Sequence, residues 1–405
     1  MTFATPGLHR FAHRTNRMQG SAIREILKAT QYPEVISFAG GLPAPELFPT
    51  QELGRATNAA IARYGPAMVQ YSLTEGIPQM RAWVAARLNR VHGTAFSPDD
   101  VVITGGSQQA LDLFAKIFLD PGDTVVVENP SYLGALQAFD AYEPTFLTLE
   151  TDDHGILPEA LSAALTRAPA MPKFLYVIPS YQNPTGITLT LERRRAIAAI
   201  CERFQLPVFE DNPYGELSFD GHEITPMIAL GSGAPITYSG TGSKIVAPGL
   251  RVAWMVIPDR SIREKIVPAK QGMDLHTGSF AQYVFHEYAT TGDQLERHIE
   301  RIRATYAKRR DAMAQALRTH MPAHVQYTLP TGGMFFWATV DASIDTDELF
   351  VRAAREKVVF VPGRSFYPSR DRGDGLRLNF SNSDEAKIAT GIERLAHVIR
   401  EYHPT

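Results

Sequence analysis

The stretch that decides the fold of this chain is Ser239-Gly240-Thr241-Gly242-Ser243-Lys244, followed closely by Pro248-Gly249-Leu250-Arg251. A tight turn of small residues presents a lysine amine to a cavity, and hydroxyls with a guanidinium nearby suit a phosphate group. A lysine held in this way forms a Schiff base with a carbonyl compound. The pattern therefore predicts a site for a phosphorylated aldehyde, and pyridoxal phosphate is the natural candidate. An ordinary loop lysine is the alternative that the stretch alone leaves open.

The composition is that of an ordinary globular protein. The 405 residues are 44% hydrophobic and 20% charged, enough for two or three domains at about 150 residues each. A formal net charge of -3 without blocks of like charge disfavours nucleic-acid binding. The lone cysteine, Cys201, excludes an intrachain disulfide and a multi-cysteine zinc site, and its apolar neighbours predict a buried helix position. The histidines show no metal-binding spacing, so we predict no metal.

The sequence contains no apolar run long enough for a membrane helix and no hydrophobic signal core, so we expect a soluble, cytoplasmic protein. An organellar transit peptide is the alternative, because the residues before the first acid, Glu25, include Arg10, Arg14, Arg17 and Arg24. Residues 16–45 are better explained as part of the fold.

Short apolar runs alternate with helical patterns between about residues 100 and 260, which predicts an α/β layer with a buried, largely parallel sheet. The expected strands are 101–103, 124–127, 174–178 and 206–210. The expected helices are 107–119, 190–204 and a long charged helix at 293–320 that leads out of the large domain.

The pattern changes after residue 330. Strands are expected at 334–337, 358–361 and 376–380, and helices at 345–357 and from 384 onward, which together form a compact α+β unit. We therefore expect three parts: an N-terminal segment, 1–50, with a short helix that covers the substrate; a large cofactor-binding domain, 51–290; and a small α+β domain, 291–405.

A second phosphate-binding feature is the turn Thr104-Gly105-Gly106-Ser107-Gln108, which joins a predicted strand to a predicted helix. Free backbone N–H groups at a helix N-terminus favour a phosphate. A plain strand-to-helix turn with Ser107 as the N-cap is the alternative. The absence of a Gly-x-Gly-x-x-Gly spacing argues against a dinucleotide site.

Polar residues also follow other predicted strands, where ligands bind in open α/β sheets. Asp211 should project from a strand end, and a buried carboxylate there needs a cationic partner such as a protonated pyridine nitrogen. An Asx-turn before Pro213 is the alternative. Asn183 and Tyr214 could hydrogen-bond a phenolate oxygen, and Tyr132 could either stack on a planar ring or pack in the core.

Taken together, these residues resemble the fold type I, pyridoxal-phosphate-dependent aminotransferases of class I/II over essentially the whole chain. Within them the chain is most similar to the subgroup with the 2-aminoadipate (LysN-type) and kynurenine aminotransferases. The stretches that carry the resemblance are Ile36-Ser37-Phe38-Ala39-Gly40-Gly41-Leu42-Pro43, Gln70-Tyr71-Ser72, Gly106-Ser107-Gln108-Gln109-Ala110-Leu111-Asp112-Leu113, Asn183-Pro184-Thr185-Gly186 and Ala269-Lys270-Gln271. The resemblance implies an α/β fold with a mostly parallel seven-stranded sheet between helices, a smaller α+β domain, and a homodimer with shared active sites.

The resemblance also implies roles for individual residues. Lys244 would hold pyridoxal phosphate as a Schiff base and move the proton, Asp211 would bind the pyridine nitrogen, Asn183 and Tyr214 would bind the ring oxygen, and Tyr132 would stack on the ring. Implied phosphate contacts are Gly106, Ser107, Gln108, Thr241, Ser243 and Arg251, with Tyr71 reaching in from the neighbouring subunit.

Substrate contacts are implied for Arg377, Gly40, Gly41 and Asn183. Arg377 matches the arginine that grips the α-carboxylate, and a surface salt bridge is its alternative. Arg24 matches an arginine that contacts a distal carboxylate in LysN-type relatives, which would suit glutamate or 2-aminoadipate. A solvated arginine on a helix face is the alternative for Arg24.

The chain departs from the subgroup at two positions. Gly242 stands where an aromatic residue is usual, and Ala253 stands where glycine is common. We expect Gly242 to open space beside the cofactor, which leaves the substrate less defined than the reaction type.

The implied activity is transfer of an amino group between an L-amino acid and a 2-oxo acid. Glutamate and 2-oxoglutarate would form one pair, with 2-aminoadipate or an aromatic or aliphatic amino acid in the other. A β-lyase, decarboxylase or racemase on the same fold is one alternative, because fold does not fix the reaction. A cofactor-sensing MocR-type regulator is another, but residues 1–35 are too few for the winged-helix domain that it would need.

Overall fold

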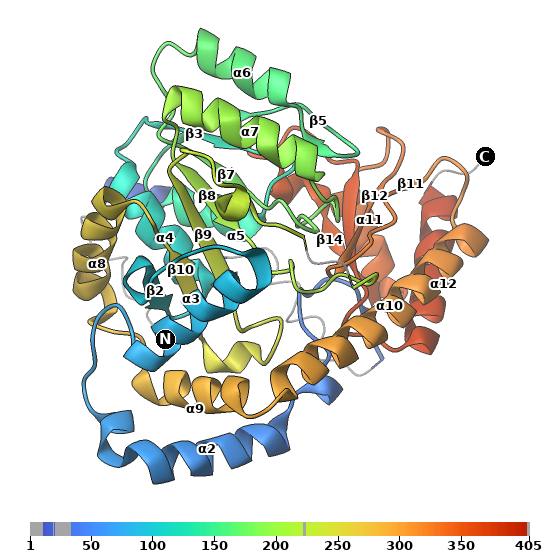
Figure 1. Cartoon of the computed structure of the whole chain (residues 1–405). Coiled ribbons are helices and arrows are strands. Elements are labelled where there is room, and N and C mark those ends of the chain that lie inside the picture. The colour runs from blue at the N-terminus through green and yellow to red at the C-terminus, as the bar shows by residue number, and fades with distance from the viewer. Residues whose placement is uncertain (1–10, 19, 21–33, 222–223, 403–405) are drawn as a thin grey trace, which may run out of the picture.

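A seven-stranded sheet forms the centre of the larger part of the molecule (Figure 1). The computed structural model describes residues 11–18, 20, 34–221 and 224–402. Strand β10 is antiparallel to both of its neighbours, and the other neighbouring pairs are parallel, so the predicted largely parallel sheet is confirmed. In spatial order the strands are β2 (Val101–Thr104), β10 (Ala253–Val256), β9 (Ile236–Thr241), β8 (Val208–Asp211), β7 (Phe174–Val177), β3 (Thr124–Val127) and β4 (Thr145–Thr148).

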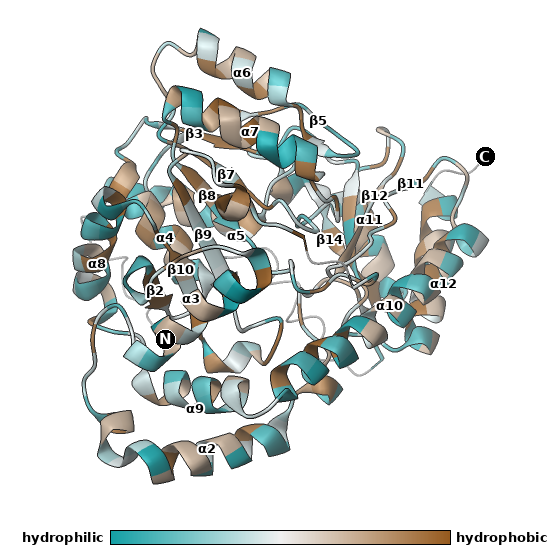
Figure 2. Cartoon of the chain, in the orientation of Figure 1, coloured by the Kyte–Doolittle hydropathy of each residue, from teal (hydrophilic) through white to brown (hydrophobic). Residues whose placement is uncertain are grey.

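Helices cover both faces of this sheet, which is why its central strands β7 and β8 are buried along their whole length (Figure 2). On one face, α6 (Pro158–Arg167) and α7 (Leu191–Phe204) pack against Val126, Leu175 and Val208, and Cys201 of α7 is buried there as predicted. The helices of the large domain are α2 (Thr50–Tyr64), α3 (Pro78–His92), α4 (Ser107–Phe118), α5 (Leu133–Asp140), α6 (Pro158–Arg167), α7 (Leu191–Phe204), α8 (Arg260–Asp274) and α9 (Ser279–Thr290); β5 (Thr151–Asp152) and β6 (Gly155–Ile156) form a hairpin.

The long helix α10 (Gln294–His320) leads from the large domain into a smaller α+β unit (Figure 1). An antiparallel sheet in the order β11–β12–β15–β14 forms this unit together with two helices. Its elements are β11 (Gln326–Tyr327), β12 (Phe335–Thr339), α11 (Thr346–Arg355), β14 (Val361–Pro362), β15 (Gly375–Asn379) and α12 (Glu385–Tyr402).

The single strand predicted at 358–361 is wrong in one respect, because the structure divides it in two. Strand β13 (Val358–Val359) pairs in parallel with β1 (Ile36–Ser37), whereas β14 pairs with β15. Phe360 lies between them and is fully buried. The N-terminal segment is thus hydrogen-bonded to the small unit. The limits 1–50, 51–290 and 291–405 stay predictions.

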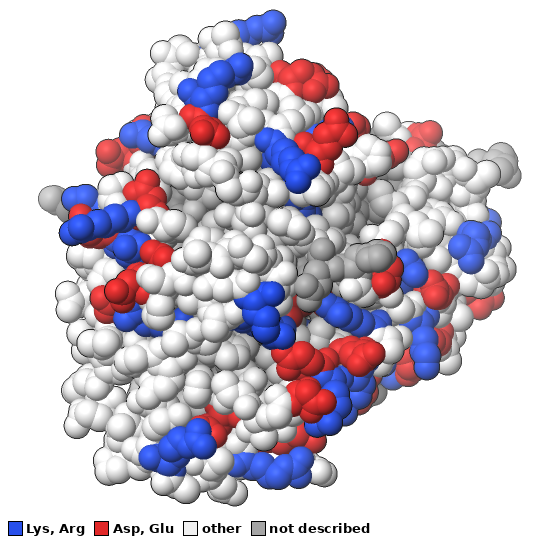
Figure 3. All heavy atoms as spheres, viewed as in Figure 1, with Lys and Arg blue, Asp and Glu red and all other residues white. Residues whose placement is uncertain are grey.

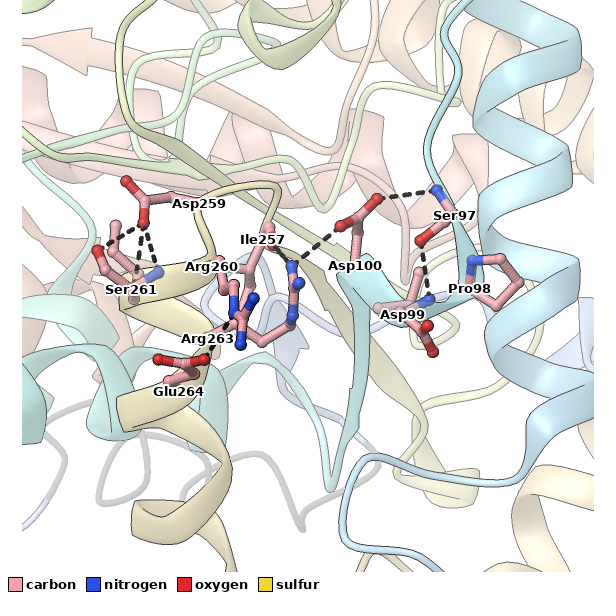
Figure 4. A network of polar contacts seen from close by, with 12 residues as sticks. Ser97, Pro98, Asp99, Asp100, Ile257, Asp259, Arg260, Ser261, Arg263 and Glu264 are labelled. Carbon is pink, nitrogen blue, oxygen red and sulfur yellow. Dashed lines mark hydrogen bonds and ion pairs between the residues drawn. The ribbon is translucent and has the colours of Figure 1, made fainter.

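A polar network ties the beginning of β2 to the end of β10 (Figure 4). Asp100 accepts hydrogen bonds from the backbone N–H of Ser97 at 2.8 Å and from Nη1 of Arg263 at 2.9 Å. Arg263 also donates to the carbonyl of Ile257, whose own N–H donates to the carbonyl of Asp100 at 2.7 Å. Asp259 caps α8. These contacts lie at the edge of the sheet opposite to the carboxyl ends of the parallel strands.

The surface in Figure 3 shows basic and acidic side chains interspersed over the visible face. Within the described ranges, no helix is long and apolar enough to cross a membrane. The same residues include no group of three or more His, Cys, Asp or Glu side chains that could hold a metal ion.

Candidate active site

A cavity of about 490 Å³ lies where the carboxyl ends of β2, β7, β8 and β9 meet β15 of the small unit. Parallel strands end at one edge of a sheet, so residues far apart in the sequence converge there. The predicted site residues that line this cavity are Gly41, Ser107, Gln108, Tyr132, Asn183, Asp211, Tyr214, Thr241, Ser243, Lys244, Arg251 and Arg377.

Lys244 lies in a turn directly after β9, and backbone hydrogen bonds fix this turn. The N–H of Gly242 donates to the carbonyl of Val252 at 3.0 Å, and the N–H of Ser243 donates to Oγ1 of Thr241 at 3.1 Å. The lysine Nζ donates to the carbonyl of Gly41 at 2.7 Å. Burial lowers the pKa of Lys244 to about 8, and the nearby arginines contribute. A sizeable fraction of the amine is therefore neutral, and nucleophilic, near pH 8.

Asp211 is the last residue of β8 and is buried. Its Oδ2 accepts a hydrogen bond from the hydroxyl of Tyr176 at 3.0 Å, whereas its Oδ1 is buried without a hydrogen-bond partner among the described residues. Burial raises the pKa of Asp211 to about 7, although the Tyr176 hydrogen bond opposes the shift. The carboxylate bonds across the sheet to Tyr176, so the Asx-turn alternative does not hold.

One part of the cavity wall is formed by the beginning of α4 and by Arg251. Gly106 precedes the helix with φ +104°, and a Cβ there would overlap the guanidinium of Arg251. Arg251 donates from Nη2 to the carbonyl of Gly105 at 3.1 Å. Within the described part of the chain, no side chain caps α4, and Ser107 is its first residue rather than its N-cap. Among the described residues, no side chain therefore competes with a phosphate for the backbone N–H groups of this helix end.

Arg377 projects from β15 and is 1% exposed, so the surface salt-bridge alternative is wrong. Its guanidinium lies 4.3 Å from the ring centroid of Phe335 and 5.2 Å from that of Phe366. Nη1 donates to Oδ1 of Asn183 at 2.9 Å, and Nη2 donates to the carbonyl of Ala39 at 2.7 Å. Burial lowers the pKa of Arg377 to about 10, which leaves it cationic. Nε is buried without a partner in the described ranges.

Two tyrosines complete the cavity. The Nδ2 group of Asn183 donates to the hydroxyl of Tyr214 at 3.4 Å. Burial raises the pKa of both Tyr132 and Tyr214, so both phenols stay protonated at neutral pH. A Cβ at Gly134 would overlap the ring of Tyr132, so this glycine is needed for Tyr132 to lie where it does.

The groups of this cavity fit pyridoxal phosphate. The unpartnered Oδ1 of Asp211 suits a pyridinium N–H, because a buried acceptor without a partner is costly. The space that a Cβ at Gly106 would fill holds the cationic Arg251 beside an uncapped helix start, which suits a phosphate dianion.

Several predicted residues lie outside the cavity wall. Tyr71, between η3 (Gly65–Val69) and α3, is 78% exposed, with its ring edge-on to His276 at 5.8 Å. Gly40 and Gly106 do not line the cavity themselves, but each is next in sequence to a residue that does. Arg24 falls outside the described residues.

The expectation for Gly242 is wrong. A Cβ at this position would overlap the ring of Phe285, which projects from α9 and is fully buried. Gly242 therefore faces the core behind the sheet and opens no space beside the cofactor. Ala253, the other departure, pairs with Thr241 and Thr104 within the sheet.

Sequence reasoning missed the residues that hold the predicted ones in place: Tyr176, Gly134, Ala39, Phe335 and Phe366. Two of them had a signal in the sequence. Ala39 lies within a stretch already singled out, and Gly134 lies two residues after Tyr132, a predicted site residue. The others are apolar or aromatic residues whose spacing predicts only burial.

Comparison with known proteins identifies the family. The family model of aminotransferase class I and II matches residues 40–395. Aromatic-amino-acid aminotransferase 1 of Thermococcus litoralis is 41% identical over 394 residues, 96% of this chain and 94% of that one. The 2-aminoadipate transaminase of Thermus thermophilus is 42% identical over 394 residues, 96% of each chain. Kynurenine aminotransferase of Pyrococcus horikoshii, solved with PMP, superposes with a TM-score of 0.93 at 41% identity over 98% of each chain. The chain therefore belongs to the class I and II aminotransferases: it is a fold type I, pyridoxal-phosphate-dependent enzyme that transfers an amino group between an amino acid and a 2-oxo acid.

Proposed function

We propose that Lys244 is the catalytic lysine of this aminotransferase and that Asp211 and Arg377 orient the two reactants around it. The observation that carries this proposal is a juxtaposition: one cavity contains a partly buried lysine amine with a pKa of about 8, an unpartnered carboxylate oxygen and a buried guanidinium. Perturbed titratable groups that converge in one cleft are typical of catalytic sites.

Each group has one task in this mechanism. When bound, pyridoxal phosphate supplies an electron sink for the negative charge that develops at the substrate Cα. Asp211 holds the ring nitrogen protonated, and the neutral amine of Lys244 removes and returns the Cα proton. Arg377 fixes the substrate carboxylate with a planar pair of N–H groups. Tyr132 would cover a face of the ring, and Asn183 and Tyr214 would hydrogen-bond the ring oxygen.

The phosphate would be held by the beginning of α4 and by side chains of the lysine turn. Support comes from the uncapped N-terminus of α4 and from the position of Arg251 against Gly106. The side chains that we assign to the phosphate are those of Ser107, Gln108, Thr241, Ser243 and Arg251, which all line the cavity.

We also propose a homodimer in which Tyr71 completes the phosphate site of the partner. The exposed ring of Tyr71 lies beside the beginning of α9, because Ser279 donates to the carbonyls of Met68 and Gln70 at 2.8 and 3.3 Å. The segments around Tyr71 and before and within α9 also expose large apolar side chains, which a partner subunit could cover: Val69, Leu73, Leu275 and Phe280. Mixing inactive Tyr71→Ala and Lys244→Ala chains tests this, because a mixed dimer restores one complete site. Recovered activity supports the shared site, and no recovery contradicts it.

For the substrates, we propose glutamate with 2-oxoglutarate as one pair and an aromatic or aliphatic amino acid as the other donor. The support is that the residues lining the cavity include Leu42, Leu133 and Tyr132, which suit an apolar or aromatic side chain. The cations among the described lining residues are Lys244, Arg251 and Arg377, each of which already has a task. Arg24 is the candidate for binding a distal carboxylate. Arg24→Met should therefore weaken the binding of glutamate and 2-aminoadipate without weakening the binding of an aromatic donor. We also propose a cytoplasmic location, which the buried, unpaired Cys201 suits.

The test is an absorbance titration of the holoenzyme with single amino acids. The visible band of the bound cofactor should convert to that of pyridoxamine phosphate on addition of a donor, and 2-oxoglutarate should restore it. Lys244→Ala should abolish the catalysed conversion while the apoprotein stays folded. A bound cofactor that no amino acid converts would contradict transamination and favour a β-lyase or decarboxylase. No bound cofactor in the wild type would contradict the role of Lys244.

A further inference from the structure

Three aromatic side chains pack together behind the strand that carries the lysine turn. They are Trp83 of α3, Trp254 of β10 and Phe285 of α9, referred to below as the aromatic trio. Their rings meet edge to face, with centroid distances of 5.8 Å for Trp83–Trp254, 5.4 Å for Trp83–Phe285 and 6.2 Å for Trp254–Phe285. Such pairs have preferred geometries, so the three rings constrain one another.

Two members of the aromatic trio occupy the space beside two glycines of the lysine strand. A Cβ at Gly240 would overlap the indole of Trp254, its cross-strand partner, and a Cβ at Gly242 would overlap the ring of Phe285. Neither glycine has a positive φ, so space rather than backbone conformation requires glycine at both positions. The rings thus lie directly against the backbone of this strand and turn.

The backbone at Gly242 has little freedom to move away from Phe285. Its N–H donates to Val252 at 3.0 Å, and its carbonyl accepts from Val246 at 2.9 Å and from Ala247 at 3.2 Å. Lys244 is two residues further on, and its amine reaches Gly41 across the cavity. In a close-packed interior, a shift of the ring would be transmitted to the turn and to this amine.

We propose that the aromatic trio positions the Lys244 amine, with Phe285 as the residue on which the lysine turn rests. Phe285 and Gly242 then act as a coupled pair: the glycine admits the ring, and the ring sets the position of the turn. This inference rests on the proposed role of Lys244. Phe285 acts through the turn and is a positioning residue rather than a catalytic one.

The test compares four holoenzymes: wild type, Gly242→Ala, Phe285→Leu and the double variant. Three quantities are measured for each: the midpoint pH of the visible cofactor band, the single-turnover rate with an amino acid, and the thermal unfolding of the apoprotein. The matched control is Phe360→Leu, the same change at a fully buried ring that packs against Phe350 in the small unit.

Gly242→Ala should shift the midpoint pH and lower the single-turnover rate about tenfold, because small misplacements of a reacting group are costly. Phe285→Leu should change the midpoint pH and the single-turnover rate by smaller amounts. In the double variant, the shorter leucine side chain should make room for the alanine methyl group, so most of the rate lost in Gly242→Ala should be recovered. Phe360→Leu should lower the unfolding temperature as Phe285→Leu does, with the midpoint pH and the rate unchanged.

Two results would overturn the proposal. One is a midpoint pH in Phe285→Leu that equals that of Phe360→Leu. The other is a rate loss in the double variant that equals the product of the rate losses in the two single variants. If Gly242→Ala does not fold, the comparison of Phe285→Leu with Phe360→Leu decides alone. A wild type without the visible band would contradict the proposed role of Lys244 instead, so the two failures are distinguishable.

Discussion

The two ends of the central sheet use charged side chains in opposite ways. Where β2 begins and β10 ends, Asp100 and Arg263 bond to each other and to nearby backbone groups, so the network is closed (Figure 4). At the other end, Asp211 and Arg377 are buried, and each keeps a polar atom without a partner among the described residues. A closed network stabilises the fold, whereas buried groups left unpartnered reduce stability and are available to a ligand.

The largest effect is expected from Asp211→Asn. The single-turnover rate with an amino acid should fall by roughly 10³-fold, because an amide cannot hold the ring nitrogen protonated. The same substitution should raise the stability of the apoprotein above neutral pH. The folded pKa of Asp211 is raised to about 7, so its contribution to stability is full at low pH and is lost as the pH rises through 7.

Thermal unfolding of the two apoproteins at pH 5 and pH 8 checks this second part. Asp211→Asn should gain stability relative to the wild type from pH 5 to pH 8, since an asparagine does not ionise. Asp100→Asn is the matched control in the closed network and should show no such gain. An Asp211→Asn apoprotein that is less stable than the wild type at pH 8 would contradict the contrast between a stabilising network at one end of the sheet and unpartnered groups at the other.

Arg377→Lys should lower kcat/KM by about 10²-fold, or roughly 2.7 kcal/mol of transition-state stabilisation. A lysine keeps the charge but cannot bond a carboxylate, Asn183 and Ala39 in the geometry of the guanidinium. Steady-state kinetics with glutamate measures the effect. An unchanged kcat/KM would mean that the buried arginine serves the fold alone.

The reactivity of Lys244 should change about tenfold per pH unit below its pKa, because the neutral amine is the nucleophile. Burial lowers this pKa to about 8, so the rate at which the apoprotein captures pyridoxal should level off above pH 8. Pyridoxal is used because it lacks the phosphate charge. A rate that still climbs at pH 10 would show an ordinary, solvated lysine.

The smallest effect on activity is expected from Arg263→Ala in the closed network. Loss of its bonds to Asp100 and Ile257 should lower the free energy of unfolding by about 1 kcal/mol, since the pair is partly exposed. Denaturant unfolding and kcat/KM measure the two quantities. A loss of kcat/KM larger than the loss of stability explains would contradict the division between the ends.

Local pattern was enough to predict most of the sheet. The strands at 101–103, 124–127 and 174–178 end within a residue of the observed ones, because buried parallel strands are apolar runs bounded by turns. The division of 358–361 into two strands could not be predicted in this way. Phe360 is one apolar residue among others, and the strands on its two sides pair with different partners: β13 with β1 near the beginning of the chain, and β14 with β15 of the small unit.

The candidate site shows the same limit. Residue types and their place after strands predicted which side chains would converge, and most of them line one cavity. The direction in which Gly242 faces could not be predicted, because it depends on Phe285, which comes from a separate helix. The pairing of Arg377 with Ala39 likewise depends on the N-terminal segment meeting the small unit.

The most direct test of the account is the ¹⁵N chemical shift of the ring nitrogen in the holoenzyme loaded with ¹⁵N-labelled pyridoxal phosphate. The account predicts the shift of a protonated pyridine in the wild type at neutral pH, with the proton hydrogen-bonded to Oδ1 of Asp211. Asp211→Asn should then give the shift of an unprotonated ring. An unprotonated ring nitrogen in the wild type would contradict the assignment of the unpartnered carboxylate oxygen to the cofactor.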